Sequence, residues 1–454
     1  MVVPVLLASL IGLRAPAPAP DLGMAIDSLI QAEVENGTMV GIYICQPDGK
    51  VLYSRMADTR FVPASNEKIL SSVLAFDRLG SDFRFRTRFW RDGDDVWVDA
   101  PGDQTMTSSQ LFDVKRRLGV SGRGVVHVRQ AYRFDFGPSW EDDDKPFRYA
   151  PACTAFSVDR AQFDVSISGG IPTVPDWCGV TIRHIGGALP ATVEYDRTHA
   201  EVTIRGNIDE KPGVLATFAL RDPDLAASRI LGMQFVPTQK VPDREPDAEI
   251  LSVPLRDYAR LCLEPSDNLL AESLLLSGSG KGNWPDAAKS MAEYHTNLLQ
   301  LRPGAIRPED GSGMSRHNLA TPFALAQLLR HAYSQPYRDD FIRAMAHSGE
   351  GTMRVRLTGL DVTAKTGTLD SVSCLSGFLG LPGGKTVVFS IMMNHYTTTA
   401  AEARKLQDAL IQAIHDSLSM RENEHAIRDA NWCDRVGQGV PLPGPDPVDG
   451  HWLY

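Results

Sequence analysis

The sequence predicts an α/β fold in which an antiparallel sheet and helices are interrupted by a β-rich inserted region. Two observations support this fold class. Helical and strand patterns alternate towards both ends of the 454-residue chain, whereas residues 82–247 show short alternating apolar runs bounded by Pro, Asp and Gly. At about 150 residues per domain, the length also favours more than one domain. We therefore predict a main domain in residues 21–81 and 248–420, and one or two inserted domains in residues 82–247.

The first elements of the main domain are predicted to be a helix, a hairpin and a second helix. Apolar residues at helical spacing predict a helix over residues 22–34. Two β-prone runs, residues 39–45 and 51–55, are joined by a turn sequence and predict a β-hairpin. The second helix begins near Ser65 and ends at a glycine.

The inserted region is predicted to be mostly β-structure, and the main domain resumes after it. Strands within the insertion are expected at residues 124–128, 163–167, 180–185 and 200–204. Beyond it we expect helices at residues 255–263, 268–276 and 321–332, a strand pair at residues 373–381 and 386–393, and a helix from Thr399 to Leu418. Residues 421–454 are polar and rich in Pro, which predicts an extended tail.

The first 20 residues are predicted to be a signal peptide. Residues 2–13 are almost all apolar, and an Ala/Pro-rich segment follows Arg14. An exported protein of the periplasm or cell envelope is therefore expected. Two other interpretations stay open, a frayed apolar terminus and an uncleaved anchor, for which twelve apolar residues are short.

Composition excludes several classes of partner. The chain is 43% apolar and 22% charged, as in globular proteins. A formal net charge of −10 argues against a nucleic-acid partner, because such a partner requires a basic surface. The six cysteines form no C-x-x-C pair, so no metal or redox centre is expected. A disulfide between Cys153 and Cys178 and a set of buried free thiols are equally open alternatives.

Three short motifs carry residue types used in acyl transfer. They are Ser65-Asn66-Glu67-Lys68, Ser266-Asp267-Asn268 and Lys365-Thr366-Gly367. They match the S-x-x-K, S-D-N and K-T-G set of serine acyl-enzymes. Each motif alone is weak, but the three in this order, on two predicted helix starts and then a strand, form a specific set.

The first motif places a nucleophile and a base on one face of a helix. Ser65 and Lys68 are three residues apart, so the hydroxyl and the amine lie side by side. Burial and a second cation such as Lys365 would favour the neutral amine, which can act as a base. The alternative for Ser65 is a simple helix cap, which serine also favours.

The other two motifs supply proton transfer and substrate binding. Ser266 would relay a proton to the leaving amine, and Asn268 would bind the substrate amide. Lys365 is expected to provide a fixed positive charge that, with Thr366 and Thr368, holds a terminal carboxylate.

Backbone groups complete the expected site. The N–H groups of Ser65 and Thr368 are the expected oxyanion hole. Gly367 indicates a close approach to the strand. For Ser266 and Asn268 the alternative is helix capping, and for Lys365 it is a solvated lysine on a strand. The joint occurrence of the three motifs argues against both alternatives.

The chain resembles the D-alanyl-D-alanine carboxypeptidase/endopeptidase family of low-molecular-mass penicillin-binding proteins, in the branch with a large inserted domain. The segments that carry the resemblance are residues 63–65, 266–272, 310–315, 351–354 and 364–369. The resemblance implies a penicillin-binding-protein/serine β-lactamase-like fold and cleavage of peptidoglycan stem peptides through an acyl-Ser65 intermediate. It also implies acylation by β-lactam antibiotics, with no cofactor and no metal.

An acidic residue shortly after a Trp of the insertion is expected, from the same resemblance, to hold the diamino-acid side chain of the stem peptide. Here Trp140 precedes a run of four acidic residues, of which Asp143 is the candidate. A solvated acidic loop is the alternative for this run.

Three other functions use the same motifs or the same fold. A serine β-lactamase is disfavoured by the 200 residues between Ser65 and Ser266, which are more than a compact hydrolase needs. A non-catalytic peptidoglycan-binding scaffold would be expected to lose at least one motif. An esterase is the third alternative. The balance between carboxypeptidase and endopeptidase action is left open by the sequence.

Overall fold

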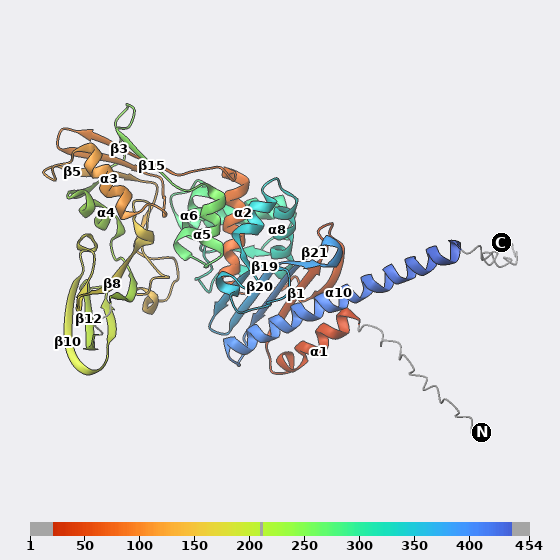
Figure 1. Cartoon of the computed structure of the whole chain (residues 1–454). Coiled ribbons are helices and arrows are strands. Elements are labelled where there is room, and N and C mark those ends of the chain that lie inside the picture. Colours follow the sequence, from red (N-terminus) through yellow and green to blue (C-terminus); the bar gives the residue numbers. More distant parts are fainter. Residues whose placement is uncertain (1–20, 209–211, 438–454) are drawn as a thin grey trace, which may run out of the picture.

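The computed structural model describes residues 21–208 and 212–437, and a six-stranded antiparallel sheet lies at the centre of its main part (Figure 1). The strand order is β18-β19-β20-β21-β1-β2. The strands are Met39–Cys45 (β1), Val51–Arg55 (β2), Ala346–His347 (β18), Val362–Leu369 (β19), Val372–Leu381 (β20) and Lys385–Asn394 (β21). The first and last parts of the chain therefore build one sheet, in which β1 pairs with β21.

Helices cover both faces of this sheet, which explains the almost continuous apolar sequence of β20 and β21. On one face lie Leu22–Glu35 (α1) and Ala400–Gly437 (α10), which share a core with buried sheet residues such as Ile391 (Figure 1). The helices on the other side of the sheet are Glu67–Leu79 (α2), Leu255–Leu263 (α5), Asn268–Ser279 (α6), Trp284–Leu298 (α7), Pro322–Ser334 (α8) and Arg338–Ala344 (α9). The helix α2, which starts next to Ser65, is thus packed inside the main part.

The segment between residues 86 and 251 builds a separate set of sheets (Figure 1). A five-stranded sheet has the order β14-β5-β4-β3-β15, with bounds Gln234–Pro237 (β14), Val125–Gln130 (β5), Asp95–Ala100 (β4), Arg86–Asp92 (β3) and Ala248–Leu251 (β15). Two helices, Ser108–Leu118 (α3) and Pro223–Leu231 (α4), pack with it. Because β3 and β15 pair side by side, the chain enters and leaves the inserted region at neighbouring positions.

Two three-stranded sheets form the far end of the insertion around a small core of their own. The first contains Thr181–Pro190 (β10), Glu201–Asn207 (β12) and Thr192–Asp196 (β11), and the second Gly213–Ala219 (β13), Gln162–Ser168 (β8) and Ile171–Thr173 (β9). Short strand pairs are Arg133–Phe134 (β6) with Cys153–Thr154 (β7), and Ile306–Arg307 (β16) with Leu319–Ala320 (β17). The domain boundaries given above remain a prediction.

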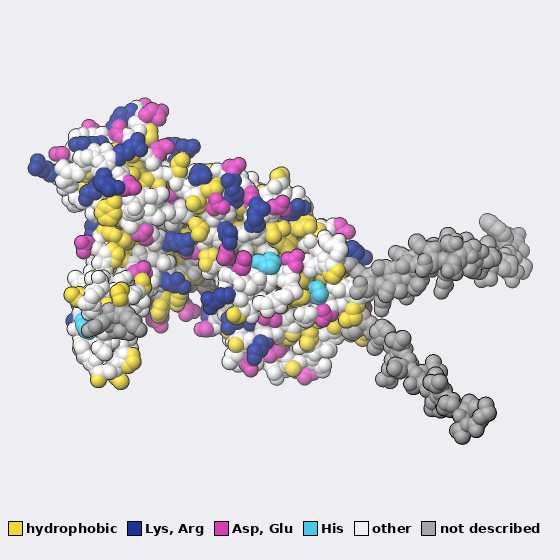
Figure 2. Space-filling model, in the orientation of Figure 1, with side chains coloured by type: hydrophobic (Ala, Val, Ile, Leu, Met, Phe, Trp, Pro, Cys, Tyr) yellow, Lys and Arg dark blue, Asp and Glu magenta, His cyan; other side chains and the backbone are white. Residues whose placement is uncertain are grey.

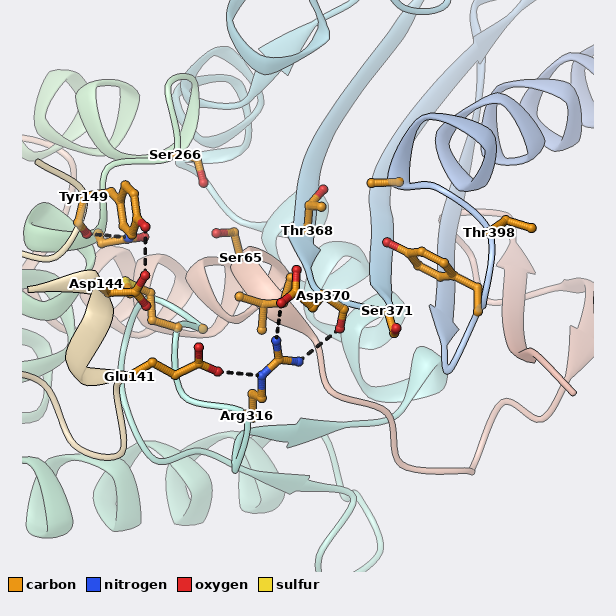
Figure 3. Close-up of a pocket in the computed structure, with 16 residues that line it drawn as sticks. Ser65, Glu141, Asp144, Tyr149, Ser266, Arg316, Thr368, Asp370, Ser371 and Thr398 are labelled. Atoms are coloured by element: carbon orange, nitrogen blue, oxygen red, sulfur yellow. Dashed lines mark hydrogen bonds and ion pairs between the residues drawn. The ribbon is translucent and has the colours of Figure 1, made fainter. Parts of the chain in front are cut away.

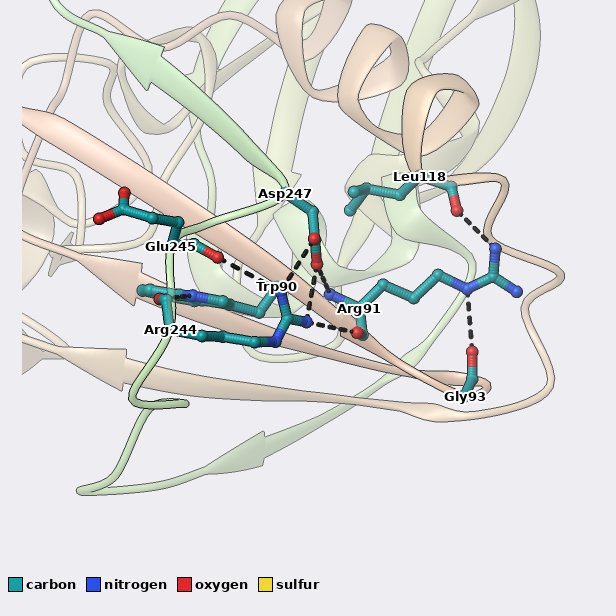
Figure 4. A network of polar contacts seen from close by, with 7 residues as sticks. All are labelled: Trp90, Arg91, Gly93, Leu118, Arg244, Glu245 and Asp247. Atoms are coloured by element: carbon teal, nitrogen blue, oxygen red, sulfur yellow. Dashed lines mark hydrogen bonds and ion pairs between the residues drawn. The ribbon is translucent and has the colours of Figure 1, made fainter.

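A polar network holds the loop before β15 against the five-stranded sheet (Figure 4). The indole N–H of Trp90 donates to the Arg244 carbonyl at 2.8 Å, and the Arg244 guanidinium donates to the Arg91 carbonyl at 2.7 Å. Asp247 accepts from the Arg91 backbone N–H at 2.7 Å and from the Arg244 guanidinium. The network fixes the segment through which the chain returns from the insertion to the main part.

One face of the five-stranded sheet carries a row of alternating charges. Glu249, Arg88, Asp99 and Arg129 lie opposite one another on successive strands. Arg129 and Asp99 form two parallel hydrogen bonds of 2.8 Å. Figure 2 likewise shows basic and acidic side chains interspersed over this end of the molecule. The opposite charges in this row balance one another, and we assign the row a structural role.

One sequence prediction is incomplete and another is wrong. The insertion is rich in β-structure, as predicted, but it also contains α3 and α4, which were not predicted. Thr107 forms a complete capping box at the start of α3 and Gly119 ends it in a left-handed conformation, so the boundary motifs were present. The predicted extended tail begins instead as a continuation of α10 to Gly437. The remainder of that tail, and the predicted signal peptide, lie outside the described residues.

Two further observations concern the cysteines and the membrane. Cys45, Cys153, Cys178, Cys262 and Cys374 are free and buried, so Cys153 and Cys178 are not joined. Within the described ranges, no helix combines the length and apolar character that spanning a bilayer requires.

The core between the sheet and helices α1 and α10 should be sensitive to truncation. Ile391 is fully buried there, so Ile391→Ala should lower the free energy of unfolding by about 2–5 kcal/mol through lost burial and a residual cavity. Leu189, which is 77% exposed, provides the matched control, and Leu189→Ala should change stability by less than about 0.5 kcal/mol. Urea unfolding measures both; equal effects would contradict the described core.

Candidate active site

The nucleophile candidate lies in a strained turn immediately before α2. Ala64 has a φ of +46°, and Ala64–Asn66 form one 3₁₀ turn that leads into the helix. A non-glycine residue rarely adopts such a φ, so the surrounding structure must hold the turn in place. Ser65 is not the cap of α2: its hydroxyl is 2.9 Å from the Nζ atom of Lys68. The capping alternative for Ser65 is therefore not supported.

The side chain of Lys68 is fully buried and contacts three oxygens. Its Nζ atom lies 2.9 Å from Ser65 Oγ, 2.6 Å from Asn268 Oδ1 and 2.6 Å from the Ser312 carbonyl oxygen. A neutral amine has two N–H donors and one lone pair. The two donors match the carbonyl oxygens of Asn268 and Ser312, and the lone pair then faces the hydroxyl of Ser65. The geometry thus suits proton transfer from Ser65 to Lys68.

The strand β19 runs directly beside the turn that holds Ser65. A Cβ atom on Gly367 would lie 2.8 Å from the Pro63 carbonyl and 3.0 Å from the backbone nitrogen of Ser65. Asn66 bridges the gap, because its side-chain amide donates to the Lys365 carbonyl at 3.1 Å. Position 367 therefore requires glycine, because β19 approaches the turn before α2 closely. The hydrogen bond of Asn66 joins the first motif to the third.

The second motif occupies the connection between α5 and α6. Ser266 has a φ of +66°, and its hydroxyl accepts a hydrogen bond from Lys365 Nζ at 2.9 Å. Asp267, rather than either neighbour, caps α6 by accepting from the Leu270 N–H at 3.0 Å. The capping alternative for Ser266 and Asn268 therefore fails.

Asn268 is engaged at both ends of its amide group. Its oxygen accepts from Lys68, and its nitrogen donates to the Tyr149 carbonyl at 2.7 Å. Asn268 therefore has one remaining side-chain N–H with which it can bind a substrate amide. Because Tyr149 belongs to the inserted region, this contact also ties the insertion to the site.

Burial shifts the pKa of both lysines downward, towards the neutral form. For Lys68, nearby acidic residues including Asp310 and Glu272 partly counteract the burial. For Lys365, burial and the charge of Lys68 act in the same direction and hold the pKa well below the usual value. Burial therefore favours the neutral form of both amines, and the role of Lys365 as a fixed cation stays a prediction.

Two buried carboxyl groups, those of Glu67 and Glu272, have raised pKa values, which favours their neutral forms. Burial, followed by the charges of Asp310 and Glu272, raises the pKa of Glu67 well above its ordinary range. Burial and then Asp310 raise the pKa of Glu272 to about 7. Neither carboxyl oxygen of Glu67 has a hydrogen-bond partner among the described residues, which is consistent with a protonated group.

A cavity of about 650 Å³ opens at Ser65 and extends towards the insertion (Figure 3). Ser266, Asn268 and Thr368 line it near the nucleophile, and acidic side chains line its far side. Arg316 crosses this side: it donates to Glu141 at 3.1 Å and to the Asp370 carbonyl at 3.0 Å. In Figure 3 Arg316 lies below Ser65, between Glu141 and Asp370.

Known proteins of one family share the sequence and the fold of this chain. The model of the D-Ala-D-Ala carboxypeptidase 3 (S13) family matches residues 22–416. The chain belongs to this family. The segments that carried the resemblance in the sequence therefore pointed to the right family, and the α/β fold class is confirmed.

Relatives match along most of their length. A D-alanyl-D-alanine carboxypeptidase of Actinomadura sp. (strain R39) is 26% identical, over 94% of this chain and 89% of the relative. The D-alanyl-D-alanine carboxypeptidase DacB of Haemophilus influenzae is 25% identical, over 78% and 85%. The crystal structure of penicillin binding protein 4 from Haemophilus influenzae superposes with a TM-score of 0.71 at 22% identity, covering 87% of this chain and 99% of that chain.

In this S13 family member the predicted site residues lie close together around Ser65, with one exception. Ser65, Lys68 and Asn268 form one hydrogen-bonded group. Lys365 and Ser266 form a second one, and Ser65 and Ser266 line the same cavity. Thr366, Gly367 and Thr368 lie beside it on β19, where Thr366 donates to Thr352 at 2.9 Å. The exception is the acidic run, which reaches the cavity through Glu141 and Asp144, whereas Asp143 is not among its lining residues.

Three contributors to the site were missed by sequence reasoning. Two are backbone carbonyls, of Ser312 and Tyr149, which no side-chain pattern can identify. The third is Asp310, which accepts from the Trp140 indole at 2.9 Å and from the backbone N–H of Gly313 and Ser315 at 2.7 Å. It holds the loop that presents the Ser312 carbonyl. Among the residues described, no cluster of three His, Cys, Asp or Glu side chains could hold a metal ion.

Gly313 should be essential for the position of the nucleophile. It has a φ of +83°, and a Cβ atom there would overlap the Ala64 carbonyl. Gly313→Ala should displace the turn before Ser65 and slow labelling by a fluorescent penicillin by about 100-fold. Gly37→Ala is the control, since Gly37 has a φ of +90° and open space around it. It should cost about 1–2 kcal/mol of stability and leave the labelling rate unchanged. Equal labelling of the two variants would contradict this account.

Proposed function

We propose that this chain is a serine-type D-Ala-D-Ala carboxypeptidase that acts on peptidoglycan stem peptides through an acyl-Ser65 intermediate. The observation that carries the proposal is the buried Lys68 amine, held between Ser65, Asn268 and the Ser312 carbonyl. Its relatives bear the names of this activity. A relative of known structure is complexed with a β-lactam, which supports acylation by such antibiotics here as well.

Acylation begins with attack of Ser65 Oγ on the carbonyl carbon of the penultimate D-alanine, while the hydroxyl proton moves to the neutral Lys68 amine. The carbonyl oxygen gains negative charge, which the backbone N–H groups of Ser65 and Thr368 are proposed to stabilise. The C–N bond then breaks. The leaving amine takes a proton through Ser266, which is hydrogen-bonded to Lys365, and D-alanine departs.

The substrate itself is proposed to prepare the base. In the free site the charge of Lys68 adds to the burial that lowers the pKa of Lys365, whereas nearby acidic groups such as Asp310 and Glu272 raise the pKa of Lys68. A terminal carboxylate bound beside Lys365 would favour protonation of this lysine. The resulting cation would lower the pKa of Lys68 by repulsion, so that the neutral base is favoured when substrate is present.

Water completes the cycle by attacking the acyl carbonyl, which releases the shortened peptide and returns the proton to Ser65. The same chemistry applies to D-alanyl crosslinks, where the leaving group is larger, so endopeptidase action uses the same residues. We further propose that Glu141 and Asp144 face an amino group of the stem peptide, since they line the cavity on the insertion side.

We also propose that the protein is exported to the periplasm or cell envelope, with residues 1–20 as its signal peptide. The substrate class supports this location, together with the apolar run of residues 2–13. Cell fractionation combined with N-terminal sequencing of the mature protein tests it. A mature protein that retains these residues in the cytoplasm would contradict it.

Ser65→Ala should abolish covalent labelling by a fluorescent penicillin. Intact mass should show a stable adduct on the wild type and on the remote, exposed control Ser121→Ala, and none on Ser65→Ala. An adduct on Ser65→Ala would disprove the acyl-enzyme. Fast labelling of the wild type followed by release of hydrolysed drug would favour the β-lactamase alternative.

Lys68→Arg should slow acylation by about 10²–10⁴-fold, because a guanidinium keeps its proton and cannot act as the base. In the wild type the acylation rate should rise with pH as Lys68 loses its proton. Since burial lowers the pKa of Lys68, the midpoint should lie below the 10.5 of a free lysine. Stopped-flow labelling between pH 5 and pH 10 measures this. A rising limb of equal midpoint in Lys68→Arg would show that another group is the base.

A further inference from the structure

A second, smaller cavity of about 320 Å³ also opens at Ser65. Ser65, Ser266 and Thr368 line both cavities, so the two meet at the nucleophile. The smaller cavity also contains Thr352 and Thr366, whose hydroxyls are hydrogen-bonded to each other at 2.9 Å. A peptide bound with its scissile carbonyl at Ser65 would therefore place one end in each cavity.

The two cavities differ in charge. The larger one is lined by Glu141, Asp144 and Asp370, with Arg316 as its basic residue. The smaller one is lined by two arginines, Arg356 and Arg404, and by no acidic residue. Since unlike charges attract, the smaller cavity suits the end of the peptide that carries a carboxylate, which is the leaving group.

The two arginines have different roles. Arg356 is committed to the protein, because its side chain is 8% exposed and donates to Asp408 at 2.7 and 3.0 Å and to Gln407 at 3.1 Å. It also donates to the Arg404 carbonyl at 3.3 Å and so fixes this part of α10. The guanidinium of Arg404 itself has no hydrogen bond or ion pair with any described residue. It is the basic group of this cavity that remains available to a ligand.

We infer that Arg404 is a specificity residue that binds the carboxylate of the leaving group. This inference rests on the proposed function. A guanidinium offers two parallel N–H donors that match a carboxylate, so it adds to the contacts expected from Thr366 and Thr368. The cavity has more volume than a D-alanine residue needs, so the same arginine can serve a larger leaving group of a crosslink that also carries a carboxylate.

The test compares two thioesters with the same acyl group, an N-acyl-D-alanyl thioglycolate and its methyl ester, which differ in the leaving-group carboxylate. The wild type should prefer the carboxylate form in kcat/KM. Arg404→Ala should lower kcat/KM for that form by about tenfold or more. It should leave the methyl ester within about twofold. Arg404→Lys should retain part of the preference. Lys405→Ala, the neighbouring exposed residue on α10, is the matched control and should change neither rate.

The outcomes separate the inference from the proposed function. A preference that survives Arg404→Ala, or an equal loss for both thioesters, would overturn the role of Arg404 while leaving the carboxypeptidase proposal intact. The methyl ester also reports on folding, since an unfolded variant would lose both activities. A wild type that neither reacts with penicillin nor cleaves either thioester would overturn the proposed function, and the inference with it.

Discussion

The site depends on keeping two lysine amines buried close to one nucleophile. A buried amine is stable only when its donors are satisfied, and Lys68 meets this requirement with three oxygens from three parts of the chain. Ser65 belongs to the turn before α2, Asn268 begins α6, and Ser312 lies on the loop after β16. Burial lowers the pKa of Lys68, so the packing that positions the amine also favours the neutral form that the proposed base requires.

The strained turns around the nucleophile follow from the same requirement. Ala64 and Ser266 both have positive φ values, which residues other than glycine rarely adopt, so the surrounding structure must hold them. Gly367 and Gly313 allow β19 and the loop containing Ser312 to approach the turn before Ser65. The three motifs therefore form one unit, in which each motif restrains another: Asn66 binds the Lys365 carbonyl, and Lys365 binds Ser266.

The local sequence predicted the elements and the motif residues well, but not the contacts made by the backbone. The hairpin of β1 and β2 was predicted to its terminal residues, because alternating apolar runs around a turn sequence are a local pattern. The helix α3 was missed because few of its residues are apolar, although Thr107 and Gly119 mark its ends. The Ser312 carbonyl could not be predicted, since any residue type supplies the same group. Four adjacent acids give no indication of which side chains face the cavity; Glu141 and Asp144 line it and Asp143 does not, so the substrate contact predicted for Asp143 stays a prediction.

The inserted region contributes to the site at its edge rather than through its sheets. Trp140 donates its indole N–H to Asp310, which in turn holds the loop that contains Ser312. The Tyr149 carbonyl binds Asn268, so two contacts from the segment between β6 and β7 reach the groups that position Lys68. Because the same short segment also carries Glu141 and Asp144, a movement of this side of the acidic cavity would disturb the contacts that position Lys68.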